Sequence, residues 1–346
     1  MGKSKPHHIL VIRLSAMGDV AMTVPVLIAL TTTYPELKVT LLTKGFLKPI
    51  FSQIPNVTIY AADVKGKHKG VLGLYRLFKE LKNLKVDAVA DLHNVLRSNI
   101  LKTFFKSSGI PVFQINKGRK EKAALTRTKN KVFKQLKTTH QRYTDVFEGL
   151  GFPIDLNEVK LLKKEALINP IKAISDSKKA KWIGIAPFAA HEGKMYPIDL
   201  MQKVIASLSK EETKILLFGG GAREIKILNG IEAEYKNVIS VAGKLSFSEE
   251  LIVISNLDIM LSMDSGNAHL ASNYNIPVIT LWGVTHPFAG FVPFGQPMEN
   301  ALLSDSETYP LIPTSVYGNK VPVGYNDVMK TILPDNVIQK ILEVIK

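Results

Sequence analysis

The chain has 346 residues, a formal net charge of +15 and 46% hydrophobic residues, enough for two globular cores. It contains no cysteine, which excludes disulfides, thiolate metal sites and cysteine nucleophiles and is typical of a protein from a reducing cytoplasm. No apolar run approaches the ~20 residues that span a bilayer, and the run at 9–14 is too short for a signal peptide, so we expect a cytoplasmic protein.

The positive charge is concentrated in the first half of the chain. Residues 1–165 hold 29 Lys and Arg against 12 Asp and Glu, whereas residues 166–346 hold 16 against 18. Within the first half, residues 117–137 carry nine basic residues and one acidic residue. Such a block is ordinarily a solvated face; its functional interpretation is a surface for nucleic acid, a phosphorylated glycolipid or the membrane that carries it. Nucleic acid is disfavoured because Phe133 is the one aromatic residue in the block and no known nucleic-acid motif is present.

Apolar, β-branched runs alternate with helix-like segments along the whole chain. The runs are mostly continuous, as expected for parallel strands that are buried on both faces. We predict strands at 9–14, 39–42, 57–60, 86–92, 112–115, 182–186, 214–218, 238–241, 257–263 and 278–281. We predict helices near 20–33, 70–84, 94–106, 139–150, 198–209, 223–235, 247–256 and 267–274. This alternation predicts an α/β protein with two doubly wound, Rossmann-like domains.

The polar stretch 163–181, which contains Asn169-Pro170, is the expected break between the domains. We therefore expect a basic first domain at 1–165 and a second domain at 178–330, and we interpret 304–326 as a long loop. Open parallel sheets bind ligands beyond the carboxyl ends of their strands, so two such domains would face a common cleft lined by those ends.

Polar residues follow the first strand, in the sequence Arg-Leu-Ser-Ala-Met-Gly-Asp at 13–19. Asp19 is either a helix-capping acid or a carboxylate at the strand's end that acts as a general base. A single glycine, Gly18, stands where a dinucleotide fingerprint needs three, so a nicotinamide dinucleotide is disfavoured.

Three further segments of this kind follow strands of the second half. Lys194 lies in the loop after 182–186 and is either exposed or a point charge for a diphosphate. Gly219-Gly220-Gly221 allows a close backbone approach to a ligand, and Glu224 either compensates a helix dipole or binds ribose hydroxyls.

The third segment, Asp264-Ser265-Gly266-Asn267, ends a buried strand and begins a helix, where free N–H groups can bind a diphosphate. Asp264 is better suited to hold loop amides or a sugar hydroxyl than a phosphate. His269 is either a buried core histidine or a hydrogen-bonding group of the cleft. Metal-ligand spacings and a Gly-x-Ser-x-Gly motif are absent, so we predict no metal site and no serine hydrolase.

Together these motifs resemble glycosyltransferase family 9, the heptosyltransferases of lipopolysaccharide core assembly. The resemblance rests on R-L-S-A-M-G-D-V-(x)₄-P at 13–25, D-L-H-N-V-L-R-S at 91–98, A-P-(x)₆-K-x-Y-P at 186–197, G-G-G-A-R-E at 219–224, M-D-S-G-N-A-H-L-A at 263–271 and L-W-G-V-T-H-P at 281–287. It covers most of the chain, with six motifs in order.

The resemblance implies a GT-B architecture with an N-terminal acceptor domain, a C-terminal nucleotide-sugar domain and a final helix, 331–346, that returns toward the first. It implies inverting, metal-independent transfer of L-glycero-D-manno-heptose from an ADP-sugar, which is a co-substrate and not a cofactor, to an anionic glycolipid at the cytoplasmic face of the inner membrane. Asp19 matches the general base of the family. The donor residues that it implies are Lys194, Glu224, Asp264, Ser265, Gly266, Asn267 and His269, supported by Gly220, Gly221 and Thr285. Our acceptor candidates are Ser15, Gly18, Arg97, Lys120 and Arg127.

Two features depart from the family pattern. Ala189 and Ala190 stand where the family often carries hydroxyl residues, so some phosphate contacts must be lost or supplied elsewhere, and Tyr196 replaces the more usual Trp. The alternatives are a GT-B enzyme that uses a UDP- or GDP-sugar, a polyanion-binding protein and an inactive sugar-binding module. The oligomeric state is not predicted.

Overall fold

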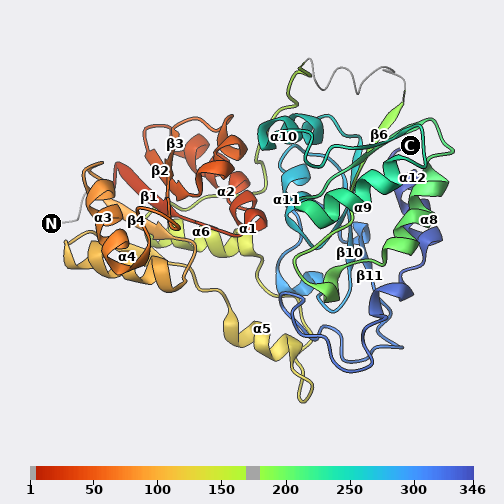
Figure 1. Ribbon diagram of the computed structural model, residues 1–346. Helices are drawn as coiled ribbons and strands as arrows, with labels where there is room; N and C mark the ends of the chain where they lie inside the picture. The colour runs from red at the N-terminus through yellow and green to blue at the C-terminus, as the bar shows by residue number, and fades with distance from the viewer. Residues whose placement is uncertain (1–4, 169–179) are drawn as a thin grey trace. The chain divides into compact units, whose positions relative to one another are not determined.

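The computed structural model describes residues 5–168 and 180–346 and consists of two compact units (Figure 1). The first unit comprises Met1–Lys117 and Thr139–Leu162, and the second comprises Gly118–Thr138 and Lys163–Lys346. The predicted boundary segment lies partly outside the described residues, since Asn169 and Pro170 belong to the part that is not described.

The first unit is a five-stranded parallel sheet with the strand order β3-β2-β1-β4-β5. Helices α3 and α4 pack on the sheet face that carries Leu10 and Ile12, and α2 packs against α6. The strands are β1 (His8–Ile12), β2 (Lys38–Thr43), β3 (Val57–Ala61), β4 (Ala88–Asp91) and β5 (Val112–Gln114). The helices are α1 (Met17–Ala21), α2 (Val24–Thr33), η1 (Gly45–Phe51), α3 (Gly70–Lys82), α4 (Leu96–Ser107) and α6 (Thr139–Gly149).

The second unit is a six-stranded parallel sheet with the order β11-β10-β9-β6-β7-β8. Its strands are β6 (Lys181–Ala186), β7 (Thr213–Leu217), β8 (Val238–Ser240), β9 (Ile259–Met263), β10 (Val278–Trp282) and β11 (Ala301–Leu303). Its helices are α5 (Arg119–Thr126), α8 (Ile198–Leu208), α9 (Ala222–Glu232), α10 (Phe247–Ser255), α11 (Gly266–Ser272) and α12 (Pro334–Val344), with short 3₁₀ turns η3 (Glu192–Lys194), η4 (Pro287–Ala289), η5 (Met298–Asn300) and η6 (Val328–Thr331).

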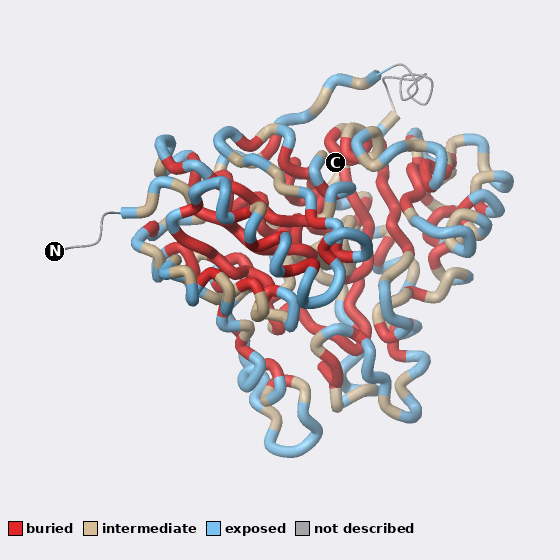
Figure 2. Tube along the Cα trace, turned by 60° about the vertical axis from the view of Figure 1, so that its left-hand side comes forward, coloured by how far each residue is buried: buried red, intermediate tan, exposed pale blue. Residues whose placement is uncertain are grey.

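Both sheets have the strand order of doubly wound α/β folds, so the predicted fold class is confirmed. Strands β4, β9 and β10 are buried along their whole length, and β1 and β6 are buried except at their first residue (Figure 2), which explains why they are continuous apolar runs in the sequence. The predicted helix at 20–33 is two helices. Pro25, which lacks an N–H, lies in the first turn of α2, and Thr23 precedes that helix.

The predicted boundary at 165 places the basic segment 118–138 in the first domain. In the structure this segment belongs to the second unit. Leu125 and Leu136 form a small apolar cluster with Ala289, and Phe288 and Phe291 pack against it. Lys122 Nζ lies 3.9 Å from the centre of the Phe291 ring, and Lys131 Nζ donates to the carbonyls of Leu311 and Pro313. The segment therefore uses the apolar stems and ammonium groups of its lysines for packing, which an analysis of charge alone does not show.

Helix α12 belongs to the second unit. The helix packs on α8 and β9, and its residues Val337 and Ile341 are fully buried in the core of the second unit. Its amphipathic pattern is thus explained by this one core.

We expect Ile341→Ala to destabilise the second unit by about 2–5 kcal/mol, because the substitution removes a fully buried aliphatic side chain and leaves a cavity. Urea unfolding would measure the change, with the exposed Gln339→Ala on the same helix as the control. An unchanged unfolding midpoint for Ile341→Ala would show that α12 is not part of this core.

Candidate active site

In the first unit, Asp19 lies just beyond the carboxyl end of β1, beside the point where the strand order reverses between β1 and β4. Its Oδ2 is 2.6 Å from Arg13 Nη2 and accepts a hydrogen bond from the Ala16 backbone N–H at 3.3 Å. The Arg13 side chain is 5% exposed and that of Asp19 is 30% exposed. The carboxylate is thus held by a buried guanidinium and a backbone N–H, while part of the Asp19 side chain remains exposed.

Arg13 and Tyr143 are two supporting residues that the sequence analysis did not single out. Arg13 Nη1 donates to the Leu92 carbonyl at 2.6 Å, so the guanidinium bridges the ends of β1 and β4. The buried Tyr143 hydroxyl donates to the backbone carbonyl of Asp19 at 3.1 Å, and burial raises the pKa of this hydroxyl. Arg13 is the first residue of the R-L-S-A-M-G-D motif, so the motif could have indicated that it belongs to the site. Tyr143 comes from α6, outside the motifs, and nothing in the sequence indicated its role.

The other candidates at this sheet edge differ in what they contact. Ser15 Oγ lies 3.5 Å from His93 Nε2, and Gly18 is half-buried in α1. Burial, with a contribution from nearby Arg13 and Lys117, lowers the pKa of His93 to about 4, so this imidazole is neutral at pH 7.

Hydrogen bonds within the turn after β4 satisfy several of its polar groups. Asp91 accepts the backbone N–H groups of His93 and Asn94 at 2.9 and 3.0 Å, which gives it a structural role. Arg97 is exposed in the first turn of α4. Lys120 and Arg127 are exposed on the segment 118–138, so they belong to the second unit and not to the predicted acceptor domain.

In the second unit, Lys194 and Asp264 form a partly buried ion pair. Lys194 follows β6 and Asp264 follows β9, the two strands at which the order of this sheet reverses. Lys194 Nζ is 2.9 Å from Asp264 Oδ2, and the two side chains are 14% and 7% exposed. We expected Asp264 to hold loop amides or a sugar hydroxyl; the structure shows that it holds the lysine.

The long loop at 304–326 lies against Lys194. Gly318 has a positive φ of 83°, and a side chain there would collide with Cγ and Cδ of Lys194. A glycine is required at this position for both reasons. The loop therefore restricts the rotamers of the lysine, a relation that its Pro- and Gly-rich composition did not reveal.

Helix α11 begins at Gly266 with Ser265 as its N-cap residue. The Ser265 hydroxyl lies 3.0 Å from Ser262 Oγ, so it pairs with the end of β9. Ser265, Gly266 and Asn267 are partly exposed, whereas His269 is buried within the helix. Because α11 has seven residues, its dipole is weak and the positive charge of this site comes mainly from Lys194.

The glycine-rich loop after β7 is closed by Glu224, whose Oε2 accepts the Gly220 N–H at 2.8 Å. Gly221, the N-cap residue of α9, has a positive φ of 82°, which explains why a glycine stands there. Glu224 therefore has a structural role in this loop, which leaves its second carboxylate oxygen for other contacts.

Two further residues of the predicted motifs are buried. Thr285 is 1% exposed, and its Oγ1 has no hydrogen-bond partner among the described residues. The Tyr196 hydroxyl donates to the Ile332 carbonyl at 2.6 Å, and burial raises the pKa of this hydroxyl to about 12. Tyr196 thus anchors the loop that carries Lys194 to the segment before α12.

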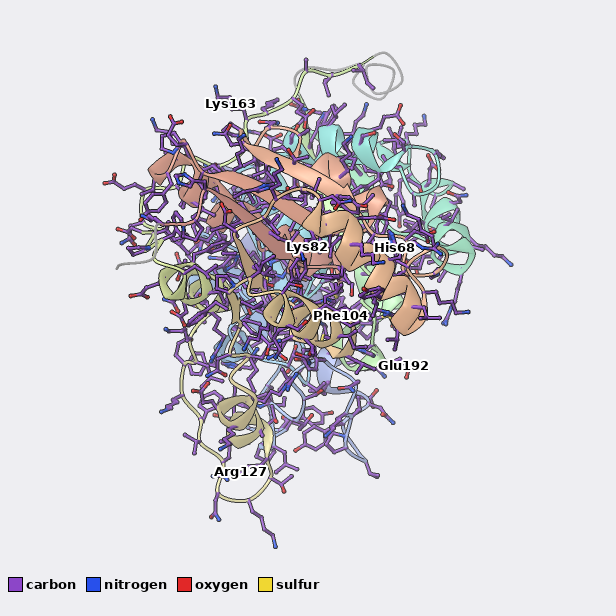
Figure 3. All side chains as sticks on the ribbon, turned by 90° about the vertical axis from the view of Figure 1, so that its left-hand side faces the viewer. His68, Lys82, Phe104, Arg127, Lys163 and Glu192 are labelled. Carbon is purple, nitrogen blue, oxygen red and sulfur yellow. The ribbon has the colours of Figure 1, made fainter. Side chains whose placement is uncertain are left out.

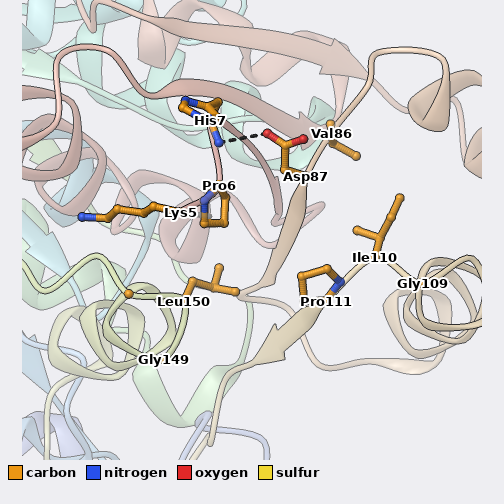
Figure 4. Close-up of a pocket in the computed structure, with 11 residues that line it drawn as sticks. Lys5, Pro6, His7, Val86, Asp87, Gly109, Ile110, Pro111, Gly149 and Leu150 are labelled. Carbon is orange, nitrogen blue, oxygen red and sulfur yellow. Dashed lines mark hydrogen bonds between the residues drawn. The ribbon is translucent and has the colours of Figure 1, made fainter. Parts of the chain in front are cut away.

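A cavity of about 710 Å³ lies at the opposite edge of the first sheet (Figure 4). Its lining includes His7, Asp87 and Pro111, which precede β1, β4 and β5. Asp87 Oδ2 accepts the backbone N–H groups of His7 and His8, each at 2.9 Å. Since parallel sheets bind substrates at their carboxyl ends, we do not place the active site in this cavity.

Comparison with known proteins identifies the family. The family model described as glycosyltransferase family 9 (heptosyltransferase) matches residues 74–310. The chain belongs to glycosyltransferase family 9. The family resemblance is thereby confirmed, and the chain is a glycosyltransferase of the heptosyltransferase family.

Individual relatives agree with this assignment. Lipopolysaccharide core heptosyltransferase OpsX of Haemophilus influenzae is 28% identical over 295 residues, which cover 82% of this chain and 80% of that protein. Family 9 structures share the fold. A glycosyl transferase family 9 protein from Veillonella parvula gives a TM-score of 0.74 at 18% identity, covering 98% of this chain and 97% of that one. The Escherichia coli heptosyltransferase WaaC, solved with ADP, gives a TM-score of 0.68 at 17% identity, and the match covers 97% of this chain and 99% of WaaC. The expected GT-B architecture is thus confirmed.

Within residues 5–168 and 180–346, no group of three or more His, Asp and Glu residues could hold a metal ion. In the same described ranges, no helix is both long enough and apolar enough to cross a membrane.

Proposed function

We propose that this family 9 enzyme transfers a heptose from ADP-heptose to an anionic, lipid-linked acceptor of the lipopolysaccharide inner core. The names of its relatives support the sugar and the acceptor, and the ADP in the WaaC structure supports the nucleotide. One observation carries the mechanistic part of the proposal: a carboxylate, Asp19, follows the switch-point strand of one sheet, and a partly buried ammonium group, that of Lys194, follows the switch-point strand of the other.

The proposed reaction is a single inverting displacement. The acceptor hydroxyl transfers its proton to Asp19 as its oxygen attacks the anomeric carbon, and the bond from that carbon to the diphosphate oxygen breaks. ADP leaves with the bonding electron pair, and its growing negative charge is stabilised by Lys194 and by the N–H groups of Gly266 and Asn267. Glu224 is the proposed ribose contact. Because Lys194 meets the diphosphate charge, the proposed reaction needs no metal ion.

We propose that the nucleotide of the donor binds to the second unit. The acceptor would bind to the first unit, at the carboxyl edge of its sheet. We propose a cytoplasmic enzyme that associates with the inner face of the membrane carrying its acceptor. Lys120 and Arg127, which belong to the second unit, remain proposed acceptor contacts.

Calorimetric titration of ADP, UDP, GDP and NAD in the presence of EDTA tests the donor. We expect ADP to bind selectively, because the structurally similar Escherichia coli WaaC was solved with ADP and with ADP-2-deoxy-2-fluoro heptose. Selective binding of UDP or GDP would retain the fold and the role of Asp19 but assign the enzyme to another donor. Loss of ADP binding on addition of EDTA would contradict metal independence.

A further inference from the structure

The outer face of α3 and α4 in the first unit exposes large apolar side chains. Val71 and Leu72 are 59% and 85% exposed, Tyr75 is 44% exposed, and Leu96 is 77% exposed. Helices α3 and α4 pack together, and the Tyr75 and Phe104 ring centres lie 5.4 Å apart. Figure 3 views this face, on which His68 marks the loop before α3, Lys82 marks the end of α3 and Phe104 marks α4.

On α3, the exposed apolar side chains lie on the face opposite to the one that packs in the core of the first unit. The buried face of α3 is formed by Gly73, Leu74, Leu77, Phe78 and Leu81, which pack on the sheet. Val71, Leu72 and Tyr75 are on the other face, where a helix that faces only water ordinarily carries polar residues. A single exposed apolar residue needs no explanation, but four at the N-terminal halves of two neighbouring helices indicate an interaction surface.

Basic residues surround this apolar group. The loop and helix at 63–82 and the helix at 96–107 carry Lys65, Lys67, Lys69, Arg76, Lys79, Lys82, Arg97, Lys102 and Lys106, against two acidic residues, Asp63 and Glu80. Both acidic residues are used within the fold. Asp63 accepts the N–H groups of Gly66 and Lys67, and Glu80 accepts hydrogen bonds from Tyr60 and the buried His68. The surface is therefore strongly positive.

The same contacts fix the three-lysine loop 65–69. The Asp63 N–H donates to His68 Nδ1 at 3.0 Å, which leaves His68 Nε2 to donate to Glu80 at 3.1 Å. The loop is thus tied at both ends. Lys67 Nζ pairs with Glu80 Oε2 at 3.3 Å, whereas Lys65 and Lys69 are exposed and shortly precede Val71 and Leu72 in the chain.

We propose that this surface, formed by the loop 65–69 and the outer faces of α3 and α4, docks on an anionic lipid bilayer. Apolar side chains that enter the interface, flanked by lysines whose ammonium groups reach lipid phosphates, match the chemistry of such a leaflet. A soluble polyanion would need the lysines but not Val71, Leu72 and Leu96. The biological role of this docking rests on the proposed function. Because α3 and α4 both begin at the sheet edge that carries Asp19, docking there would present a lipid-linked acceptor to this edge.

Vesicle co-sedimentation of the full chain tests the surface. We expect binding to equimolar phosphatidylcholine and phosphatidylglycerol, weaker binding at high salt, and little binding to phosphatidylcholine alone. The double variant Val71→Ser/Leu72→Ser should lower the partition coefficient about tenfold, since both side chains lose apolar burial in the lipid. Lys65→Gln/Lys69→Gln should lower the partition coefficient about twenty-fivefold, at roughly fivefold for each lysine near an anionic surface.

Matched controls come from exposed residues of the second unit. Val323→Ser removes an exposed apolar side chain, and Lys203→Gln/Lys236→Gln removes two exposed charges; both should leave the partition coefficient unchanged. If the wild type binds neither vesicle, the proposal is overturned. It is also overturned if the lysine variant reduces binding and the Val71→Ser/Leu72→Ser variant does not, a result that would favour a polyanion or protein partner.

Calorimetric titration of ADP into the same preparations separates this proposal from the proposed function. Both surface variants should bind ADP as the wild type does, because their residues lie in the first unit and the proposed donor site lies in the second. A wild-type protein that binds anionic vesicles but not ADP would refute the donor assignment and leave the docking surface supported.

Discussion

Asp19→Asn is expected to lower the rate of sugar transfer about a thousandfold or more, while ADP binds with nearly unchanged affinity. Asparagine has almost the same shape as aspartate, and its carbonyl oxygen can still accept from Arg13 and from the Ala16 N–H. It cannot take the proton of the acceptor hydroxyl at neutral pH. The change should therefore appear in kcat, as measured by steady-state transfer from ADP-heptose, and ADP affinity should be measured by calorimetry.

Asp155→Asn is a suitable control, because Asp155 is an exposed acid of the same unit whose side chain accepts one backbone N–H, a contact that asparagine retains. If ADP affinity fell in parallel with the rate of Asp19→Asn, Asp19 would be a binding or folding residue and the base would have to be sought elsewhere.

The pattern of buried strands and intervening helices was sufficient to predict both sheets. Each predicted strand is present, because parallel strands covered on both faces leave a long apolar signal in the sequence. Strand β11 and helix α5 were missed. The strand is three residues long at the edge of its sheet, and the helix has more charged than apolar residues.

The candidate site was predictable as a set of positions but not as a set of contacts. Lys194 and Asp264 lie 70 residues apart in the numbering, and their ion pair depends on the neighbouring places of β6 and β9 in the sheet, which local pattern does not encode. The predicted domain boundary rested on the polar stretch 163–181 and so placed segment 118–138 in the first domain. In the structure, Lys122 of this segment lies over the Phe291 ring and Lys131 donates to carbonyls of the loop at 311–313, contacts between distant parts of the chain that local pattern does not encode.

Lys194→Met is the second substitution with a large expected effect, a loss of about a hundredfold in ADP affinity. Methionine retains the apolar volume against Gly318 but removes the ammonium group that would meet the diphosphate. It also leaves the 7%-exposed carboxylate of Asp264 without the cation that the structure places 2.9 Å away. An uncompensated negative charge at this position would repel the diphosphate in addition to the lost attraction, so calorimetry should show an effect larger than that of an ordinary surface lysine.

The double variant Lys194→Met/Asp264→Asn distinguishes these two causes. If repulsion by Asp264 contributes, the double variant should regain part of the lost ADP affinity, about tenfold, because the unpaired carboxylate is gone. Lys226→Met, at an exposed lysine of α9 in the same unit, should bind ADP as the wild type does. Equal affinities for Lys194→Met and Lys226→Met would refute the diphosphate role of Lys194, and its ion pair with Asp264 would then be a structural feature of the loop after β6.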